Sequence, residues 1–106
     1  MKQGFGTPYS VTAAGTTTVT ATVTGVANTA IYITDVDVST DIVGAVMLVS
    51  QGSTVLWQDR ILNSAAGLAV YGKTFSTPLV GAPGASVTVS ITGTTYCSAN
   101  VAGFTR

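Results

Sequence analysis

Alternation of apolar and hydroxyl side chains is the feature that most limits the folds open to this chain of 106 residues. It is clearest in "TVTATV" (18–23) and "SVTVSIT" (86–92), where every second residue is apolar and threonine or serine takes the other positions. A period of two places the apolar side chains on one face of an extended strand and the hydroxyls on the other. Nineteen threonines and fifteen valines, which are β-branched, favour strands as well. The sequence therefore predicts an all-β protein.

Turn residues separate the strand-like runs, as in an antiparallel sandwich or barrel rather than in βαβ units. "VMLVSQGSTVLWQD" (46–59) predicts a hairpin, since Gly52 at its centre can take the positive φ of a tight turn. "APG" (82–84) marks a second turn, and the alanine-rich "NSAAGLAVYGK" (63–73) is expected to be a loop leading into a strand. Seven or eight strands are expected, in one domain over 16–106.

The segment "AIYITDVDVST" does not keep a single phase. Ile31 and Ile33 share one face of an extended strand, whereas Val36 and Val38 share the opposite face. Two explanations stay open at this point. A β-bulge near Thr34 would switch the faces, or the strand is covered on both faces at one end.

The first fifteen residues predict an irregular N-terminal arm, because Gly4, Gly6, Pro8 and Gly15 interrupt any strand pattern. Four residues of the arm are candidate anchors on a partner surface: Lys2, Phe5, Tyr9 and Val11. A simple disordered tail would hold few aromatic residues, which favours an arm that becomes ordered when it meets that surface. The alternative is that the arm pairs along the edge of the sandwich within its own subunit.

The first strand of the hairpin has apolar side chains on both faces, since Val46 and Leu48 lie opposite Met47 and Val49. If one pair packs in the core, the other pair needs a second cover. A monomer rarely exposes a large apolar patch, so a neighbouring subunit or a larger assembly is expected to provide it. All four residues are therefore candidates for an oligomer interface.

Charged residues form only 8% of the chain, with four basic and four acidic side chains. This balance gives no electrostatic footprint for nucleic acid or for an anionic membrane surface. The chain has no histidine and no glutamate, so the usual general acids and bases reduce to aspartates, lysines, tyrosines and one cysteine. The sequence therefore predicts a protein that binds and does not catalyse.

The single cysteine, Cys97, excludes an intrachain disulfide and is expected to be a small buried side chain in a strand. The N-terminal residues lack the continuous apolar region of a signal peptide, which predicts synthesis in a reducing cytosol. No stretch is apolar enough to predict a membrane span, because the uncharged segment 42–58 is interrupted by polar residues and glycine.

Three aspartates, Asp35, Asp37 and Asp41, form the motif "DVDVSTD". The first two would project from the same strand face and could chelate a hard cation such as Ca²⁺. The competing explanation is a solvated rim or protection of a strand edge. A calcium loop concentrates more oxygen ligands around a glycine turn within about twelve residues, so neither a metal nor another cofactor is predicted.

The order of several elements resembles small β-sandwich virion proteins encoded in the structural gene clusters of tailed phages. Members typically show a strand of the form "IYITD", here 31–35, and then a hairpin. A "TPL", here 77–79, precedes a Gly/Pro turn and an alternating strand, and Asn-x-x-Gly-aromatic, here 100–104, closes the pattern. The resemblance covers roughly 29–104 and depends on order and spacing rather than on any one motif.

This resemblance implies a jelly-roll-like structural protein of a phage particle. We therefore expect an antiparallel β-sandwich of jelly-roll type that binds the major capsid protein on the outer head surface and stabilises the shell. A trimer is favoured, because trimers suit the local symmetry of icosahedral shells. The protein would be made in the host cytoplasm and reside in the virion, on the capsid surface. One rival is a head or tail fibre module that binds host surface glycans through Tyr9 or Tyr71, and another is a cytosolic adaptor unrelated to phage.

Overall fold

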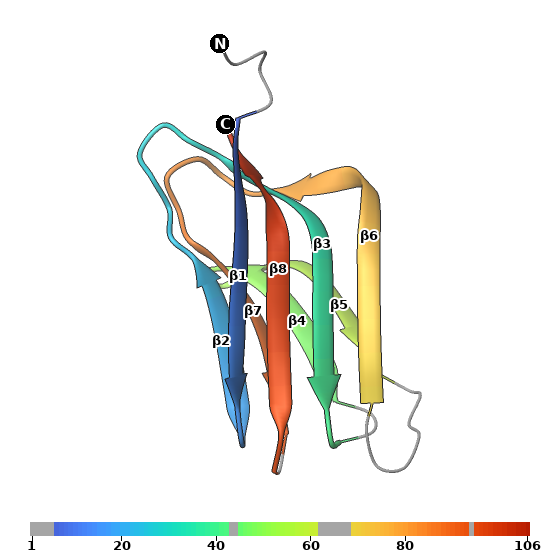
Figure 1. The fold of residues 1–106 in the computed structure, drawn as a ribbon. Helices are drawn as coiled ribbons and strands as arrows, with labels where there is room; N and C mark the ends of the chain where they lie inside the picture. Colours follow the sequence, from blue (N-terminus) through green and yellow to red (C-terminus); the bar gives the residue numbers. More distant parts are fainter. Residues whose placement is uncertain (1–5, 43–44, 62–68, 94) are drawn as a thin grey trace.

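The computed structural model describes residues 6–42, 45–61, 69–93 and 95–106. These residues form eight strands in two four-stranded antiparallel sheets (Figure 1). In chain order, the strands are β1 (Thr7–Gly15), β2 (Thr18–Val23), β3 (Ile31–Thr40), β4 (Val46–Gln51), β5 (Thr54–Arg60), β6 (Ala69–Val80), β7 (Val87–Thr92) and β8 (Cys97–Thr105). No helix that could cross a membrane occurs in this part of the chain.

The strand order identifies a jelly roll. One sheet has the order β1-β8-β3-β6 and the other has the order β2-β7-β4-β5, so strands adjacent in sequence mostly lie in opposite layers. Figure 1 shows the two layers facing each other, with β1, β8, β3 and β6 in front. Two four-stranded antiparallel sheets with this double Greek-key order are the jelly-roll arrangement. The all-β class, the sandwich and the number of strands predicted from sequence are confirmed.

The alternating strands place their apolar side chains between the sheets, as predicted. In β2 and β7 every valine, alanine and isoleucine is buried, while the hydroxyl residues point outward. The largest side chains that are almost fully buried are Ile31, Ile33, Val36, Met47, Val49, Ile61, Val87, Val89, Ile91 and Val101. Removing such side chains from water is the main favourable contribution to folding.

A β-bulge in β3 explains the change of phase seen in the sequence. Ile33 pairs with Gly103 and the next pair is Asp35 with Ala102, which leaves Thr34 as the additional residue. Residues on both sides of the bulge, such as Ile33 and Val36, therefore face the core. Of the two explanations left open by the sequence, the bulge is the one observed.

The irregular arm predicted over 1–15 is wrong for residues 7–15, which form β1. This strand pairs with β8 along its whole length, from Thr7 opposite Thr105 to Gly15 opposite Cys97. Pro8 is tolerated because β1 lies at the edge of the sheet, where a missing N–H leaves no partner unsatisfied. The alternative of an arm that pairs along the sandwich edge in its own subunit is therefore correct for this segment.

Both predicted turns are present, and one side chain connects them. Gly52 turns the β4–β5 hairpin with a φ of 61°, and Gly84 has a φ of 85° in the β6–β7 turn. The Gln51 amide donates to the carbonyl oxygens of Ala82 and Ala85, and its Oε1 accepts from the Ala82 N–H. The hairpin thus holds the second turn in place. The loop predicted ahead of β6 lies mostly outside the described residues.

Gly103 provides a test of the packing around β8. A Cβ on this residue would overlap the carbonyl oxygen of Tyr32 and lie 2.8 Å from the hydroxyl of Tyr9. We expect Gly103→Ala to lower the free energy of unfolding by roughly 1–3 kcal/mol, because neither the backbone nor the packed ring can move aside freely. Urea denaturation followed by circular dichroism measures this change.

The matched control is Gly72→Ala in β6, whose Cβ would meet only the end of the exposed Asp37 side chain, at 2.6 Å. Because that carboxylate can rotate away, the control should change the free energy of unfolding by less than about 0.5 kcal/mol. Equal denaturation midpoints for the two variants would contradict the packing described here.

Candidate binding surfaces

Cys97 does not have the environment of a nucleophile. It is fully buried, its Sγ lies 3.5 Å from the carbonyl oxygen of Thr17, and burial raises the pKa of its thiol. A reactive cysteine needs access and a stabilised thiolate. Cys97 is therefore a core side chain, as the sequence predicted.

Two of the three aspartates of "DVDVSTD", Asp35 and Asp41, accept hydrogen bonds within the chain. Asp35 and Asp37 share the outer face of β3, as expected, but Asp35 accepts hydrogen bonds from the hydroxyls of Thr34 and Thr74, both within 2.9 Å. Asp41 lies beyond the strand and accepts from the N–H and hydroxyl of Thr95. Among the described residues, no group of three or more His, Cys, Asp or Glu side chains is placed to hold a metal ion.

The predicted anchors on the arm do not form an outward-facing set. Tyr9 and Val11 belong to β1 and pack against the core from its inner face. Tyr9 reaches across β8 and donates its hydroxyl to the carbonyl oxygen of Tyr32 at 2.9 Å. Lys2 and Phe5 lie outside the described residues. Alternation in β1 turns the side chains of Tyr9 and Val11 inward, where they are partly buried, so their role in binding a partner stays a prediction.

The predicted interface in β4 is divided between the two faces of the sheet. Met47 and Val49 have no exposed surface and belong to the core, so including them in an oligomer interface is wrong. Val46 is 41% exposed and Leu48 is half-buried, both on the outer face. Val55 of the neighbouring strand β5 is 50% exposed. The outer face of β4 and β5 therefore keeps the apolar side chains that lack a cover.

A row of apolar side chains, which the sequence alone does not reveal, also crosses the outer face of the other sheet. The register places Pro8, Phe104, Tyr32 and Val80 directly opposite one another on β1, β8, β3 and β6. The rings of Tyr32 and Phe104 stack with centroids 4.7 Å apart and an angle of 9° between their planes. Val80 is 49% exposed. We call these four residues the aromatic row.

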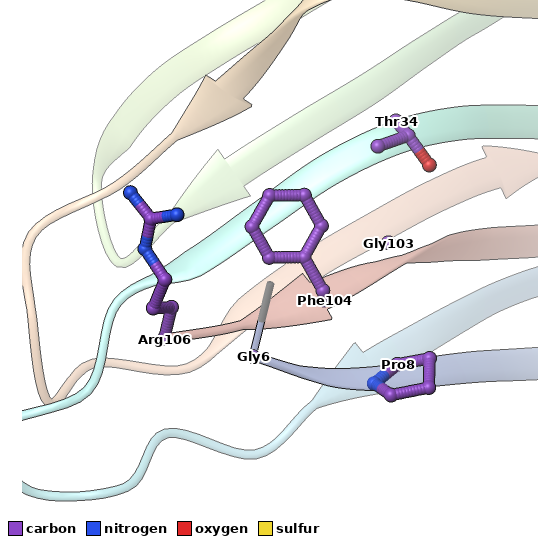
Figure 2. A pocket seen from close by; sticks show the side chains of 6 residues that line it. All are labelled: Gly6, Pro8, Thr34, Gly103, Phe104 and Arg106. Carbon is purple, nitrogen blue, oxygen red and sulfur yellow. The ribbon is translucent and has the colours of Figure 1, made fainter. Parts of the chain in front are cut away.

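A hollow of about 320 Å³ lies beside the aromatic row. Gly6, Pro8, Thr34, Gly103, Phe104 and Arg106 line it, and most of its surface is apolar (Figure 2). In the view of Figure 2 the Phe104 ring stands between Arg106 on one side and Pro8 and Thr34 on the other. The Arg106 guanidinium carbon lies 5.5 Å from the centre of the Tyr32 ring, a cation–π distance.

The edge strands β5 and β6 face each other across the side of the sandwich, where aromatic side chains meet a cation. The Trp57 and Phe75 rings pack edge to face at 5.2 Å, and the Lys73 ammonium lies 5.5 Å and 5.8 Å from their centres. Trp57 is thus a packed side chain. Its indole N–H is buried without a partner at hydrogen-bond distance among the described residues.

Tyr71, one of the two tyrosines considered for sugar stacking, lies at the same edge of the sandwich. Burial and then the hydrogen bond to Asp59 raise the pKa of Tyr71, and the nearby indole N–H of Trp57 offsets part of the rise. The same hydrogen bond lowers the pKa of Asp59. The Tyr71 hydroxyl is therefore already used within the chain. Together with the hydrogen bond from Tyr9 to Tyr32, this leaves neither tyrosine hydroxyl free to bind a sugar.

The aromatic row could not be found from the sequence because it depends on register. The glycines around Pro8 predict an irregular arm, and the bulge in β3 puts Tyr32 and Val36 on opposite faces, although a regular strand would put them on the same face. Phe104 stood out only as the last residue of a closing motif. The signal that the sequence does contain is local: each of these residues lies next to one that faces the core, such as Ile33 beside Tyr32. A period of two then places the neighbour outside.

The Tyr9 hydroxyl gives a pH-dependent test of its inward position. Burial raises the pKa of Tyr9 well above its usual value, so above about pH 10 the unfolded chain loses a phenolic proton that the native chain keeps. The free energy of unfolding should therefore fall as the pH rises above about 10, and it should fall less in Tyr9→Phe. At neutral pH this variant should lose roughly 1 kcal/mol with the hydrogen bond.

Urea denaturation between pH 8 and pH 11 measures both effects. An identical pH dependence in the wild type and in Tyr9→Phe would show that Tyr9 ionises as easily in the native state as in the unfolded state. That outcome would contradict the burial of its hydroxyl.

The outer faces of the two sheets are thus candidate binding surfaces of the described chain. Both combine exposed apolar side chains with a few polar groups, which is typical of surfaces that contact other molecules. Comparison of the chain with protein-family models, with curated proteins and with solved structures finds no match.

Proposed function

We propose that this protein is a structural component of a bacteriophage particle, which binds the major capsid protein on the outer head surface as an oligomer and stabilises the shell. The observation that carries the proposal is the presence of exposed apolar side chains on the outer faces of both sheets of a jelly roll. A β-sandwich has two outer faces, so it can contact its own copies with one and a shell with the other. Jelly rolls are also a common architecture of viral capsid domains.

Binding explains these surfaces better than catalysis does. The described chain has its cysteine in the core, and three of its four aspartates accept hydrogen bonds from neighbouring groups. Phage decoration would act by mass action, because a protein that binds only the assembled shell stabilises that state by its binding free energy. Covering apolar surface on both partners supplies that free energy.

The rival function, a fibre module that binds host glycans, receives less support. Jelly rolls also form lectin domains, so the fold by itself favours neither function. A sugar needs an accessible ring face together with several free hydrogen-bonding groups. Tyr9 faces the core and Tyr71 bonds Asp59, whereas the accessible rings of Tyr32 and Phe104 stack on each other.

The outer face of β4 and β5 is the surface that we assign to self-association, in a trimer as the favoured assembly. Val46 and Val55 are exposed there, and Leu48 lies between them on the same face. The hydroxyl rows of β2 and β7 lie beside this patch, so it is an apolar area within a polar face. Closed cyclic assemblies are the common outcome for soluble homo-oligomers.

Light scattering coupled to size exclusion tests this assignment. Leu48→Ser should shift the protein at tens of micromolar from an oligomer to a monomer, because it puts a hydroxyl at the centre of the patch. Thr20→Ser, on the hydroxyl rows of the same sheet, is the control and should keep the wild-type mass. A wild-type protein that is monomeric at this concentration would contradict self-association.

The particle itself provides the test of function. A mass-spectrometric inventory of purified particles from a phage that encodes this chain should contain it in many copies, and washing with denaturant should release it before the major capsid protein. Particles without the protein should lose their DNA at a lower temperature. Absence of the protein from purified particles would refute the proposal.

A further inference from the structure

We propose that the aromatic row and the hollow beside it form the docking site for the shell protein, which inserts one apolar side chain into the hollow and places a carboxylate against Arg106. This inference rests on the proposed function and names the surface that performs it. The aromatic row and the hollow, rather than the N-terminal arm, are then the expected contact with the partner.

The position of the row makes it available to a partner. The neighbours of its members along the strands, such as Ile33 and Leu79, face the core, so the row itself lies on the outer face of the sheet. It runs across all four strands, from β1 at one edge to β6 at the other. A surface of this kind can meet a flat partner without any movement of the jelly roll.

The site is already ordered, which lowers the entropy lost on binding. Tyr32 and Phe104 hold each other in a stacked pair, and the Tyr32 backbone oxygen is bonded by Tyr9 from the inner side of the sheet. Arg106 and Ala30 exchange two backbone hydrogen bonds of 3.0 Å and 3.1 Å, which fix the start of the arginine side chain. Rigid aromatic residues and arginine dominate the binding energy of protein interfaces.

The chemistry of the hollow favours an apolar side chain over a sugar. Its volume is at the low end of the roughly 300–1,000 Å³ of ligand pockets, and its lining is mostly apolar. The Thr34 hydroxyl lies 2.9 Å from Asp35 Oδ2 and 3.2 Å from the Ala102 carbonyl oxygen, so its proton is already donated within the chain. A sugar ring would lose hydrogen bonds to water there, whereas an apolar side chain would not.

The charge of Arg106 favours a partner that also places a carboxylate next to the hollow. Among the described residues that line the hollow, Arg106 is the one that carries a charge, and a guanidinium pairs best with a carboxylate. A second copy of this chain is a poorer source of that carboxylate, since Asp35, Asp41 and Asp59 each accept hydrogen bonds in their own chain. Its fourth aspartate, Asp37, offers a single exposed carboxylate. We therefore assign the site to a different protein with an apolar side chain next to an acidic one.

Binding to undecorated phage particles tests the site through two pairs of variants. Phe104→Ala should weaken binding at least tenfold, because it removes one wall of the hollow. Tyr96→Ala, an aromatic truncation just before the other end of β8, should bind like the wild type. Arg106→Gln should weaken binding several-fold at low ionic strength, with a smaller difference at high salt. Lys73→Gln on β6, which also removes one positive charge but lies on neither proposed surface, is its matched control.

The outcomes separate this inference from the proposed function. If the wild type binds particles and both Phe104→Ala and Arg106→Gln bind equally well, the decoration function stands and the docking site is wrong. If the wild type does not bind particles, the proposed function itself fails. Arg106→Gln keeps the test valid if Phe104→Ala does not fold, since the two hydrogen bonds of residue 106 come from its backbone.

Two further results would assign the hollow to another occupant. Loss of oligomerisation in Phe104→Ala, seen by light scattering, would place a second copy of this chain on the row and overturn the inference. Binding of the wild type to immobilised bacterial surface polysaccharide, with loss in Phe104→Ala, would identify a sugar and overturn it too. An unchanged oligomer and no polysaccharide binding are the expected results.

Discussion

The pairing of β8 with β1 on one side and β3 on the other is the interaction on which the rest of the structure depends. It joins the first and last strands of the chain, and the residues it brings together are far apart in sequence. Its inner side is made of small side chains such as Cys97, Ala99 and Val101, which let the two sheets pack closely. The loss of chain entropy in closing these long loops is offset by the burial that the closed sandwich allows.

The same strand connects the core with the candidate binding surface. Gly103 leaves the space that allows the Tyr9 hydroxyl to reach the carbonyl of Tyr32, while the next residue, Phe104, stacks on the Tyr32 ring from outside. Tyr32 is therefore held from both sides of the sheet, by the Tyr9 hydroxyl on the inner side and by the Phe104 ring on the outer side. A larger residue at position 103 would disturb the packing inside and the aromatic row outside at once, so stability and binding are coupled there.

The two outer faces divide the functions that we propose. The face of β4 and β5 has aliphatic side chains among hydroxyls and suits contacts between copies of the chain. The face of β1, β8, β3 and β6 has a rigid aromatic pair, a hollow and a guanidinium, which are the features of a specific docking site. With only eight charged residues in the chain, apolar burial and shape rather than long-range electrostatics would determine affinity.

The sequence by itself determined the fold class, because a period of two is a local pattern. The alternation in β2 and β7, the glycine at the hairpin turn and the lack of histidine and glutamate each constrain the chain without knowledge of any distant contact. The burial of Cys97 follows from the same local reasoning. The sequence also shows that the strand changes phase near Thr34. It does not show that a β-bulge, rather than a cover on both faces, is the cause.

The tertiary structure alone decided which residues meet. Pairing with β8 makes residues 7–15 a strand, although their glycines and proline suggest an arm, since cross-strand hydrogen bonds and burial outweigh weak local propensity. Sheet order selects Met47 and Val49 for the core and leaves Val46 outside. The aromatic row exists only because register aligns residues as distant as Pro8 and Phe104. Register depends on contacts across the whole chain, and no local pattern contains that information.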